Sequence, residues 1–363
     1  MAEVSFRRGH RESIRTAPLR AFAGDEESAF KVGAWFLATR GNLPAERYCK
    51  LHSISVERAQ STGSNSVGGF LVPLEMQRAI IAIREVTGAF RAAADVRPMG
   101  SDSSIVPRRT SGLTASFTTE NPSSIGKSQF GVDGVSLVAK KLTTFTSAAN
   151  ELSEDAIIDL GEFITLEAGY AFAVKEDDCG FNGDGTSAYG GTRGIATLLA
   201  DGNHNAGKYT ASGHATFDAI TSTDLSNLMN LAPGVALANG AWFTSPAGFA
   251  QIFCRLAHAS GGIIMMPDLS GRLRPTYLGF PVILTQAIVN SSPTGKLICA
   301  FGDLSLAATV GDRKEVTLFE SRHGSGYFET DSSAYRVSER VDINVHDLGD
   351  NTTAGPIVGM FAG

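Results

Sequence analysis

A glycine-rich segment, CGFNGDGTSAYGGTRGI at 179–195, holds the residue types in this sequence that could do chemistry. Within it, the run from Gly183 to Ala188 matches the G-x-G-x-x-G/A pattern, whose glycines let a backbone approach a dinucleotide pyrophosphate. That fingerprint requires a strand before it and a helix after it. Here a helical pattern precedes the glycines and none follows. The sequence therefore predicts no dinucleotide site at this loop.

The same loop does not satisfy the patterns for calcium or phosphate. An EF-hand with Gly185 as its sixth residue requires an acid at position 180 and a glutamate at 191, and glycine stands at both. No GK[ST] follows, so the loop is not a P-loop. Glycines supply positive φ and let a chain leave a helix and reverse sharply. We therefore predict a hinge loop formed by Gly180, Asn182, Gly183, Asp184 and Gly185.

The remaining candidates for chemistry are few. His204 and His214 lie near Asp201 and Asp218, which makes a metal cluster conceivable, with an ordinary polar loop as the alternative. The sequence has no HExxH spacing, no G-x-S-x-G elbow and no CxxC pair among its four cysteines. We expect no catalytic residue, no cofactor and no metal site, and hence a protein that is not an enzyme.

Composition indicates one large or two ordinary domains in 363 residues, with a formal net charge of −6. No apolar run approaches the roughly 18 residues of a membrane span, and the basic N-terminus lacks the apolar core of a secretory signal. The first twenty residues are arginine-rich on an otherwise acidic chain. Such an arm can contact a polyanion or a neighbouring chain, or can be a solvated tail. The arginines concerned are Arg7, Arg8, Arg11, Arg15 and Arg20.

Two long segments are unusual for an ordinary globular domain. Residues 150–178 read as a helix of roughly 40 Å, capped by Ser153, with two neighbouring apolar stripes. One stripe runs from Ile157 to Ala171, and the other from Phe163 to Val174. Residues 103–150 read as two strands around a polar, turn-rich tip. A two-stranded hairpin is marginal alone in water, so we expect it to need a partner surface on another chain.

The other segments complete a mixed α+β chain. Residues 22–60 read as an arm with two helical pieces, the first capped by Asp25, and 61–69 read as a linker. Residues 195–300 alternate short strands and helices, which indicates a compact α/β region. Residues 301–347 read as long alternating strands. The ending, NTTAGPIVGMFAG, reads as a loop and a short apolar tail.

The order of these features resembles the major capsid proteins of tailed bacteriophages, with the Hong Kong 97 fold. FAGDEESAFKVGAWFLATRGN resembles their N-terminal arm, and GSNSVGGFLVPLEM their entry into the body. The hairpin resembles their extended E-loop, the long helix their spine helix, and the glycine loop the connection to their axial domain. AWFTSPAGFAQI, LGFPVILTQ and FGDLSLAATVGDR are similar to axial-domain elements, and SSAYRVSERVDINV is similar to their last long strand.

The resemblance implies a division of the chain into seven segments. They are an N-terminal arm at 1–66, the entry to a peripheral domain at 67–103, an E-loop hairpin at 104–142, the peripheral domain with its spine helix at 143–188, an axial domain at 189–311, the long strands of the peripheral domain at 312–349, and a C-terminal tail at 350–363. The glycine loop then becomes a joint between two domains.

The resemblance also implies function: a head protein that self-assembles into hexamers and pentamers of an icosahedral or prolate shell enclosing double-stranded DNA. Assembly is expected in the bacterial cytoplasm and the final place in the virion capsid, with no membrane involved. The E-loop tip would contact a neighbouring subunit through Thr119, Glu120, Asn121 and Lys127, and the arm arginines would contact DNA phosphates without sequence preference. Portal, scaffolding and decoration proteins are further candidate partners.

Three alternatives stay open at this point. An encapsulin-like compartment shares the fold but encloses cargo enzymes, and a soluble α/β enzyme would account for 195–300 alone. Some relatives also cross-link an E-loop lysine to an asparagine of a neighbouring subunit, which would pair Lys127 with Asn344 or Asn351 here. The simpler interpretation is that these residues are an exposed lysine and loop asparagines that form no cross-link. The arm begins near residue 17, so we expect no scaffolding segment in the numbered sequence. We expect either that such a segment has been removed by a protease or that a separate protein provides the scaffold.

Overall fold

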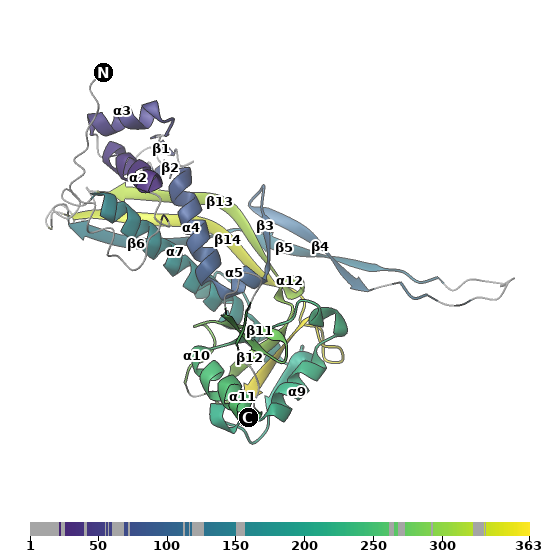
Figure 1. Ribbon diagram of the computed structural model, residues 1–363. Helices are drawn as coiled ribbons and strands as arrows, with labels where there is room; N and C mark the ends of the chain where they lie inside the picture. Colours follow the sequence, from purple (N-terminus) through teal and green to yellow (C-terminus); the bar gives the residue numbers. More distant parts are fainter. Residues whose placement is uncertain are drawn as a thin grey trace.

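The computed structural model describes residues 22, 26–39, 42–54, 56, 58–59, 69–71, 73–111, 113–115, 117, 127–149, 157–260, 265–267, 273–291, 293–321, 330 and 332–363. The helix caps expected at Asp25 and Ser153 lie outside these residues. Figure 1 shows an elongated body around one sheet, a second body around another sheet, and a two-stranded hairpin that projects far from both.

The elongated body is built on a six-stranded sheet with the order β1-β2-β13-β14-β6, with β3 also paired to β13. Its centre is the antiparallel pair of β13 (Ala308–Ser321) and β14 (Ser332–Val345), and β6 (Lys140–Ala149) pairs with β14 along its whole length. The shorter strands are β1 (Arg58–Ala59), β2 (Gly69–Leu71) and β3 (Asp95–Pro98). The long strands expected at the C-terminal end are therefore confirmed.

Helices cover this sheet. The predicted long helix is α7 (Ile157–Asn182), whose 26 residues span about 39 Å, and it packs along α4 (Leu74–Thr87). The two helices expected in the arm are α2 (Glu26–Thr39), which packs on α7, and α3 (Leu43–Leu51). Asn42 caps α3 by accepting a hydrogen bond from the backbone N–H of Ala45. Short α5 (Ala89–Ala93) joins α4 to β3.

The two stripes expected on the long helix have different environments. Ile164 and Ala168 of the first stripe are buried with Phe172 against α2 and α4, although Ala171 of that stripe is exposed. The second stripe is divided: Leu166 is partly buried against the core, whereas Phe163, Tyr170 and Val174 are exposed. The helix buries the face that packs on α2, α4 and β14 and leaves the opposite face exposed.

The second body surrounds a seven-stranded sheet with the order β7-β15-β12-β8-β11-β10-β9. The strands are β7 (Lys208–Ala211), β8 (Ala241–Thr244), β9 (Met265–Pro267), β10 (Leu273–Tyr277), β11 (Phe280–Leu284), β12 (Leu297–Gly302) and β15 (Ile357–Ala362). The compact α/β region expected at 195–300 is confirmed. The expectation of a loop and apolar tail at the C-terminus is wrong, because every residue of β15 is buried between β12 and β7.

Helices of the second body are short. They are α8 (Ile195–Leu199), α9 (Ser222–Leu231), α10 (Pro246–Gly248), a π-helical segment η5 (Phe249–Cys254) and α11 (Arg255–Ser260). The short helix α12 (Leu304–Ala307) contacts α5, β3 and β13 of the elongated body. Single 3₁₀ turns are η1 (Ser187–Tyr189), η2 (Asn205–Gly207), η3 (Phe217–Ala219) and η4 (Gly234–Leu237). Thr221 and Asp224 form a reciprocal capping box at the start of α9.

One apolar cluster crosses from the elongated body to the second body. It joins Phe90 of α5 and Phe181 of α7 to Phe243 of β8, and continues to Val310 of β13 and Ile343 of β14. The rings of Phe90 and Phe181 meet edge to face at 5.4 Å, and those of Phe181 and Phe243 lie 5.9 Å apart. The two sheets therefore share a core at their junction instead of being joined by a bare linker.

Candidate assembly site

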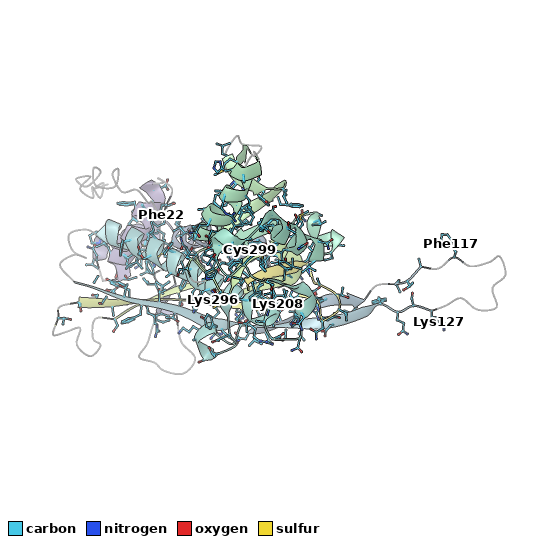
Figure 2. The ribbon with its side chains drawn as sticks, turned by 90° about the horizontal axis from the view of Figure 1, so that it is seen from below. Phe22, Phe117, Lys127, Lys208, Lys296 and Cys299 are labelled. Carbon is cyan, nitrogen blue, oxygen red and sulfur yellow. The ribbon has the colours of Figure 1, made fainter. Side chains whose placement is uncertain are left out.

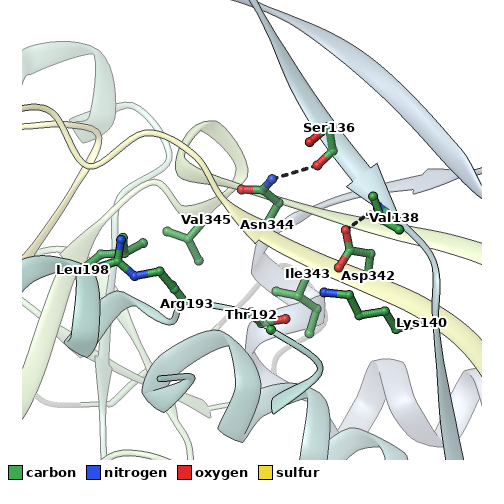
Figure 3. A pocket seen from close by; sticks show the side chains of 11 residues that line it. Ser136, Val138, Lys140, Thr192, Arg193, Leu198, Asp342, Ile343, Asn344 and Val345 are labelled. Carbon is green, nitrogen blue, oxygen red and sulfur yellow. Dashed lines mark hydrogen bonds between the residues drawn. The ribbon is translucent and has the colours of Figure 1, made fainter. Parts of the chain in front are cut away.

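The projecting hairpin consists of β4 (Ser103–Ser111) and β5 (Gly131–Val138), an isolated antiparallel pair. Its base is fixed to the elongated body. Leu137 is completely buried, and the carboxylate of Asp342 accepts a hydrogen bond from the backbone N–H of Val138 at 2.7 Å. Asn344 donates its side-chain amide to the Ser136 carbonyl at 3.0 Å, and Figure 3 shows both bonds. Burial raises the pKa of Asp342, while the Val138 N–H opposes that shift.

A second attachment lies on the other strand. The Arg108 guanidinium donates to the carbonyl oxygen of His346, just beyond β14, and lies 3.4 Å from Asp133 across the hairpin. Burial and the Arg108 charge lower the pKa of His346, so its ring stays neutral at physiological pH. These bonds from β14 and the residue after it set the direction in which the hairpin leaves the body.

Exposed apolar side chains occur along the hairpin. Ile105 and Val132, on its two strands, are 73% and 58% exposed, and Leu113 and Phe130 lie further out. Phe117 is fully exposed, and Figure 2 shows it with Lys127 at the far end of the hairpin. Exposed apolar side chains gathered on one projecting element are typical of a surface that another chain covers.

The predicted contact residues fall partly within this hairpin. Lys127 lies near the tip and is exposed, whereas Thr119, Glu120 and Asn121 lie outside the described residues. The five arm arginines, Arg7, Arg8, Arg11, Arg15 and Arg20, also lie outside them. The apolar residues of the hairpin were not singled out by sequence reasoning; their only signal was alternation in a segment with no core of its own.

The predicted hinge residues occupy two different environments. Gly180 is a residue of α7, and Asn182 is its last residue. A Cβ on Gly180 would come within 2.3 Å of the Phe90 ring, so this glycine permits a close contact between α7 and α5. Asn182 donates its side-chain amide to the Ala287 carbonyl at 2.6 Å, which connects the helix end to the second body.

The loop itself is closed by backbone hydrogen bonds. Gly194 donates to the Gly183 carbonyl at 2.8 Å, and Gly185 donates to the Thr192 carbonyl at 2.9 Å. Gly185 has a φ of +84°, the left-handed region that favours glycine. Asp184 accepts from the backbone N–H of Thr186, and this bond helps lower the pKa of its exposed carboxyl. The segment thus forms a fixed reversal that leads from α7 into α8.

Asp177, which sequence reasoning missed, connects three elements at the same junction. Its carboxylate accepts from the backbone N–H groups of Ala89 and Phe90 at the start of α5, at 3.1 and 2.8 Å. It also accepts from the Thr285 hydroxyl, just after β11, at 2.9 Å. Burial raises the pKa of Asp177, and the three hydrogen bonds oppose that shift.

The candidate metal residues are not brought together. The His204 ring lies 3.0 Å from Asp201, and the His214 ring lies 2.8 Å from Asp224 instead of Asp218. Hydrogen bonds from Asn203, His204 and Arg193 lower the pKa of Asp201 to about 2, although partial burial opposes them. Among the described residues, no three histidine, cysteine or acidic side chains are placed to hold a metal ion.

A pocket of about 310 Å³ opens where the hairpin base, the glycine loop and β14 meet (Figure 3). Its polar lining includes Lys140, Thr192, Arg193, Asp342 and Asn344. Arg193 is paired with Asp201 at 2.9 Å. Within the part of the chain that the structure describes, no helix is both long and apolar enough to cross a membrane.

An extended hairpin, a long helix beside long strands, and a separate α/β body together define a shell-forming subunit of the Hong Kong 97 type. The model of the phage capsid family matches residues 68–348, and the chain belongs to this family. It is 25% identical, over 339 residues, to the major capsid protein of Klebsiella oxytoca phage phiKO2, an alignment that covers 89% of this chain and 75% of that protein.

Solved structures with the same fold come from several kinds of shell. The capsid of an empty GTA particle is 16% identical with a TM-score of 0.55, covering 84% of this chain and 96% of that one. Mycobacterium phage Adephagia is 16% identical with a TM-score of 0.52, covering 87% and 97%. An encapsulin complex from Synechococcus elongatus is 11% identical with a TM-score of 0.51, covering 87% and 94%. The α+β capsid fold implied by the resemblance is confirmed.

Proposed function

We propose that this chain is the major head protein of a tailed phage and assembles into hexamers and pentamers of a closed icosahedral or prolate shell around double-stranded DNA. Membership of the phage capsid family supports the shell role. The observation that carries the proposal is the hairpin, which is anchored at its base and carries exposed apolar side chains along its length. A marginal two-stranded pair with exposed Ile105 and Val132 is explained if a neighbouring subunit covers it.

Assembly by such a hairpin needs no single strong interface. Each subunit extends its hairpin to one neighbour and receives the hairpin of another, so the interfaces are heterologous and can close into rings. Within a ring the second and later contacts form at high effective concentration, which makes weak contacts sufficient for a stable shell. Thr119, Glu120, Asn121 and Lys127 are the proposed contacts at the tip.

The other segments receive roles in the same proposal. The second body is the axial domain, which packs around hexamer and pentamer centres, and it includes β15 at the C-terminus. The elongated body is the peripheral domain, and the arm arginines contact DNA phosphates or a neighbouring subunit. The segment boundaries given under Sequence analysis, with β15 moved to the axial domain, are part of the proposal. So are assembly in the host cytoplasm and binding of portal, scaffolding or decoration proteins.

Electron microscopy of the purified protein, with a sizing profile, tests the proposal. Closed shells or rings of five and six support it, whereas a chain that stays monomeric at high concentration contradicts it. The likeness to an encapsulin complex makes a cargo compartment the second candidate. Shells purified from phage-producing cells that contain double-stranded DNA support the phage role, and shells that contain only protein support the second candidate.

A further inference from the structure

Five charged side chains meet inside the elongated body where α4, α5, α7, β13 and β14 converge. They are Arg84, Arg91, Glu176, Asp312 and Glu339, and four of the five side chains are at most 3% exposed. Asp312 is the exception, at 28%. Nothing in the assembly role requires a charged cluster in this position, and an apolar cluster of equal volume would often be as stable.

The three carboxylates of the cluster differ in the number of arginines that they contact. One oxygen of Glu176 accepts a hydrogen bond from Arg91 at 3.1 Å and forms an ion pair with Arg84 at 3.0 Å. Asp312 also faces both guanidinium groups and is partly exposed. Glu339 accepts from Arg84 alone. The second oxygens of Glu176 and Glu339 are buried and have no hydrogen-bond partner among the described residues.

Two arginines face three carboxyl groups, so full ionisation leaves the cluster with a net charge of −1. An ionised carboxylate away from water is much less stable than the neutral acid unless it is paired and hydrogen-bonded. The arginines next to the cluster on the same two strands, Arg313 and Arg340, both bind Asp102. Asp177 adds a further carboxylate beside Glu176, and its own bonds are to Ala89, Phe90 and Thr285.

We infer that this buried cluster binds one proton at neutral pH, with Glu339 as the preferred site, and that the folded subunit releases it only in alkaline solution. Glu339 is preferred because it has a single guanidinium partner and no access to water. Burial raises its pKa to about 8, and Glu176 and Asp312 add to that shift while Arg84 and Arg91 oppose it. Burial also raises the pKa of Glu176 against the effect of the same arginines.

The bound proton makes the free energy of unfolding depend on pH in a defined direction. An unfolded glutamate has a pKa of about 4.3. Between that pH and about 8 the folded chain holds a proton that the unfolded chain releases, so stability falls as the pH rises. Above the folded pKa, Glu176 and Glu339 both carry charge and repel, which weakens the packing of α7 on β14.

Urea unfolding of the full-length subunit between pH 5.5 and 9.5 tests the inference. Glu339→Gln replaces the acid by a neutral group of the same shape. We expect the unfolding constant of the wild type, divided by that of Glu339→Gln, to rise by about tenfold per pH unit up to pH 8 and then level off. Glu167→Gln, on the exposed face of α7, should follow the wild type. A wild-type slope retained in Glu339→Gln overturns the inference.

Infrared spectroscopy of the wild type gives a second readout in case the variant does not fold. Labelling the glutamate carboxyl carbon with ¹³C separates glutamate bands from those of the buried aspartates. We expect a protonated glutamate band in the folded protein at pH 6.5 that disappears by pH 9.5. Its absence at pH 6.5 overturns the inference. Both measurements use the unassembled subunit, so their results are independent of whether the subunit assembles into shells.

Discussion

The ring of Phe90, in α5, lies directly against the backbone of Gly180, in α7, where a Cβ atom would come within 2.3 Å of the ring. This contact brings Phe90 against Phe181, and Phe181 against Phe243 of the second body. The junction of the two bodies is thus organised by a glycine within a helix as well as by the glycine loop that follows the helix.

Replacing Gly180 by alanine should destabilise the subunit by about 1–3 kcal/mol, because the added methyl group must displace a completely buried ring. Urea unfolding followed by tryptophan fluorescence measures the change. Gly234→Ala is the matched control, since no atom lies within 4 Å of a Cβ placed there. Equal stability of the two variants would show that the junction tolerates expansion.

Replacing residues 112–130 by Asn-Gly should leave a folded subunit that does not close into shells. Ser111 and Gly131 are paired across the hairpin, so a two-residue turn can join them without disturbing the base. Circular dichroism and urea unfolding should match the wild type, and microscopy should show no closed particles. Shells of normal yield would refute the role assigned to the hairpin.

A single substitution near the end of the hairpin tests the contribution of an apolar side chain to assembly without changing the length of the hairpin. Phe117→Ser should lower particle yield without changing subunit stability, because this side chain is fully exposed in the subunit. Thr114→Ser, on the same exposed stretch, should assemble normally. Sizing chromatography of the assembly reaction compares the two, and indistinguishable yields would mean that no partner covers Phe117.

Gly185→Val should impair assembly more than it changes secondary structure. Valine at a φ of +84° is strained by about 1–3 kcal/mol, and the strain falls on the reversal between α7 and α8. Particle counts and circular dichroism are the measurements, with Gly234→Val as the control at a position that has normal φ and open space. Wild-type particle yield would contradict the expected outcome.

Acid should weaken the hydrogen bonds that Asp201 accepts from Asn203, His204 and Arg193. The folded pKa of Asp201 is lowered to about 2, below its unfolded value, so its contribution is complete above about pH 4 and is lost as the pH falls through 2. Asp201→Asn should therefore show a smaller loss of stability than the wild type between pH 4 and 2. Urea unfolding across that range checks this, and parallel curves would mean that these three bonds to the ionised carboxylate contribute nothing.

Local patterns were sufficient for the elements and for their order. Apolar period predicted α7, alternation predicted β13 and β14, and the hairpin was recognised because a polar tip separated two strands with no core. The order of these pieces then indicated the capsid fold. Such features depend on neighbours in sequence, which is why a single chain reveals them.

Other features depended on which segments meet. PIVGMFAG looked like a tail because nothing local distinguishes a buried strand from a short apolar ending, and its partners β12 and β7 lie far away in sequence. Both stripes of α7 are apolar, so the sequence did not show which face of the helix is exposed; only packing decides that.

The amino-acid sequence by itself determined the helices, the long strands, the projecting hairpin and the family, because these follow from local periodicity and from the order of elements. Only the tertiary structure decided that Gly180 serves packing, that Asp177 connects α7 to α5 and Thr285, and that Arg84 meets Glu339. These relationships join residues separated by up to 255 positions. Burial and charge at such contacts depend on the whole fold, so no local pattern encodes them.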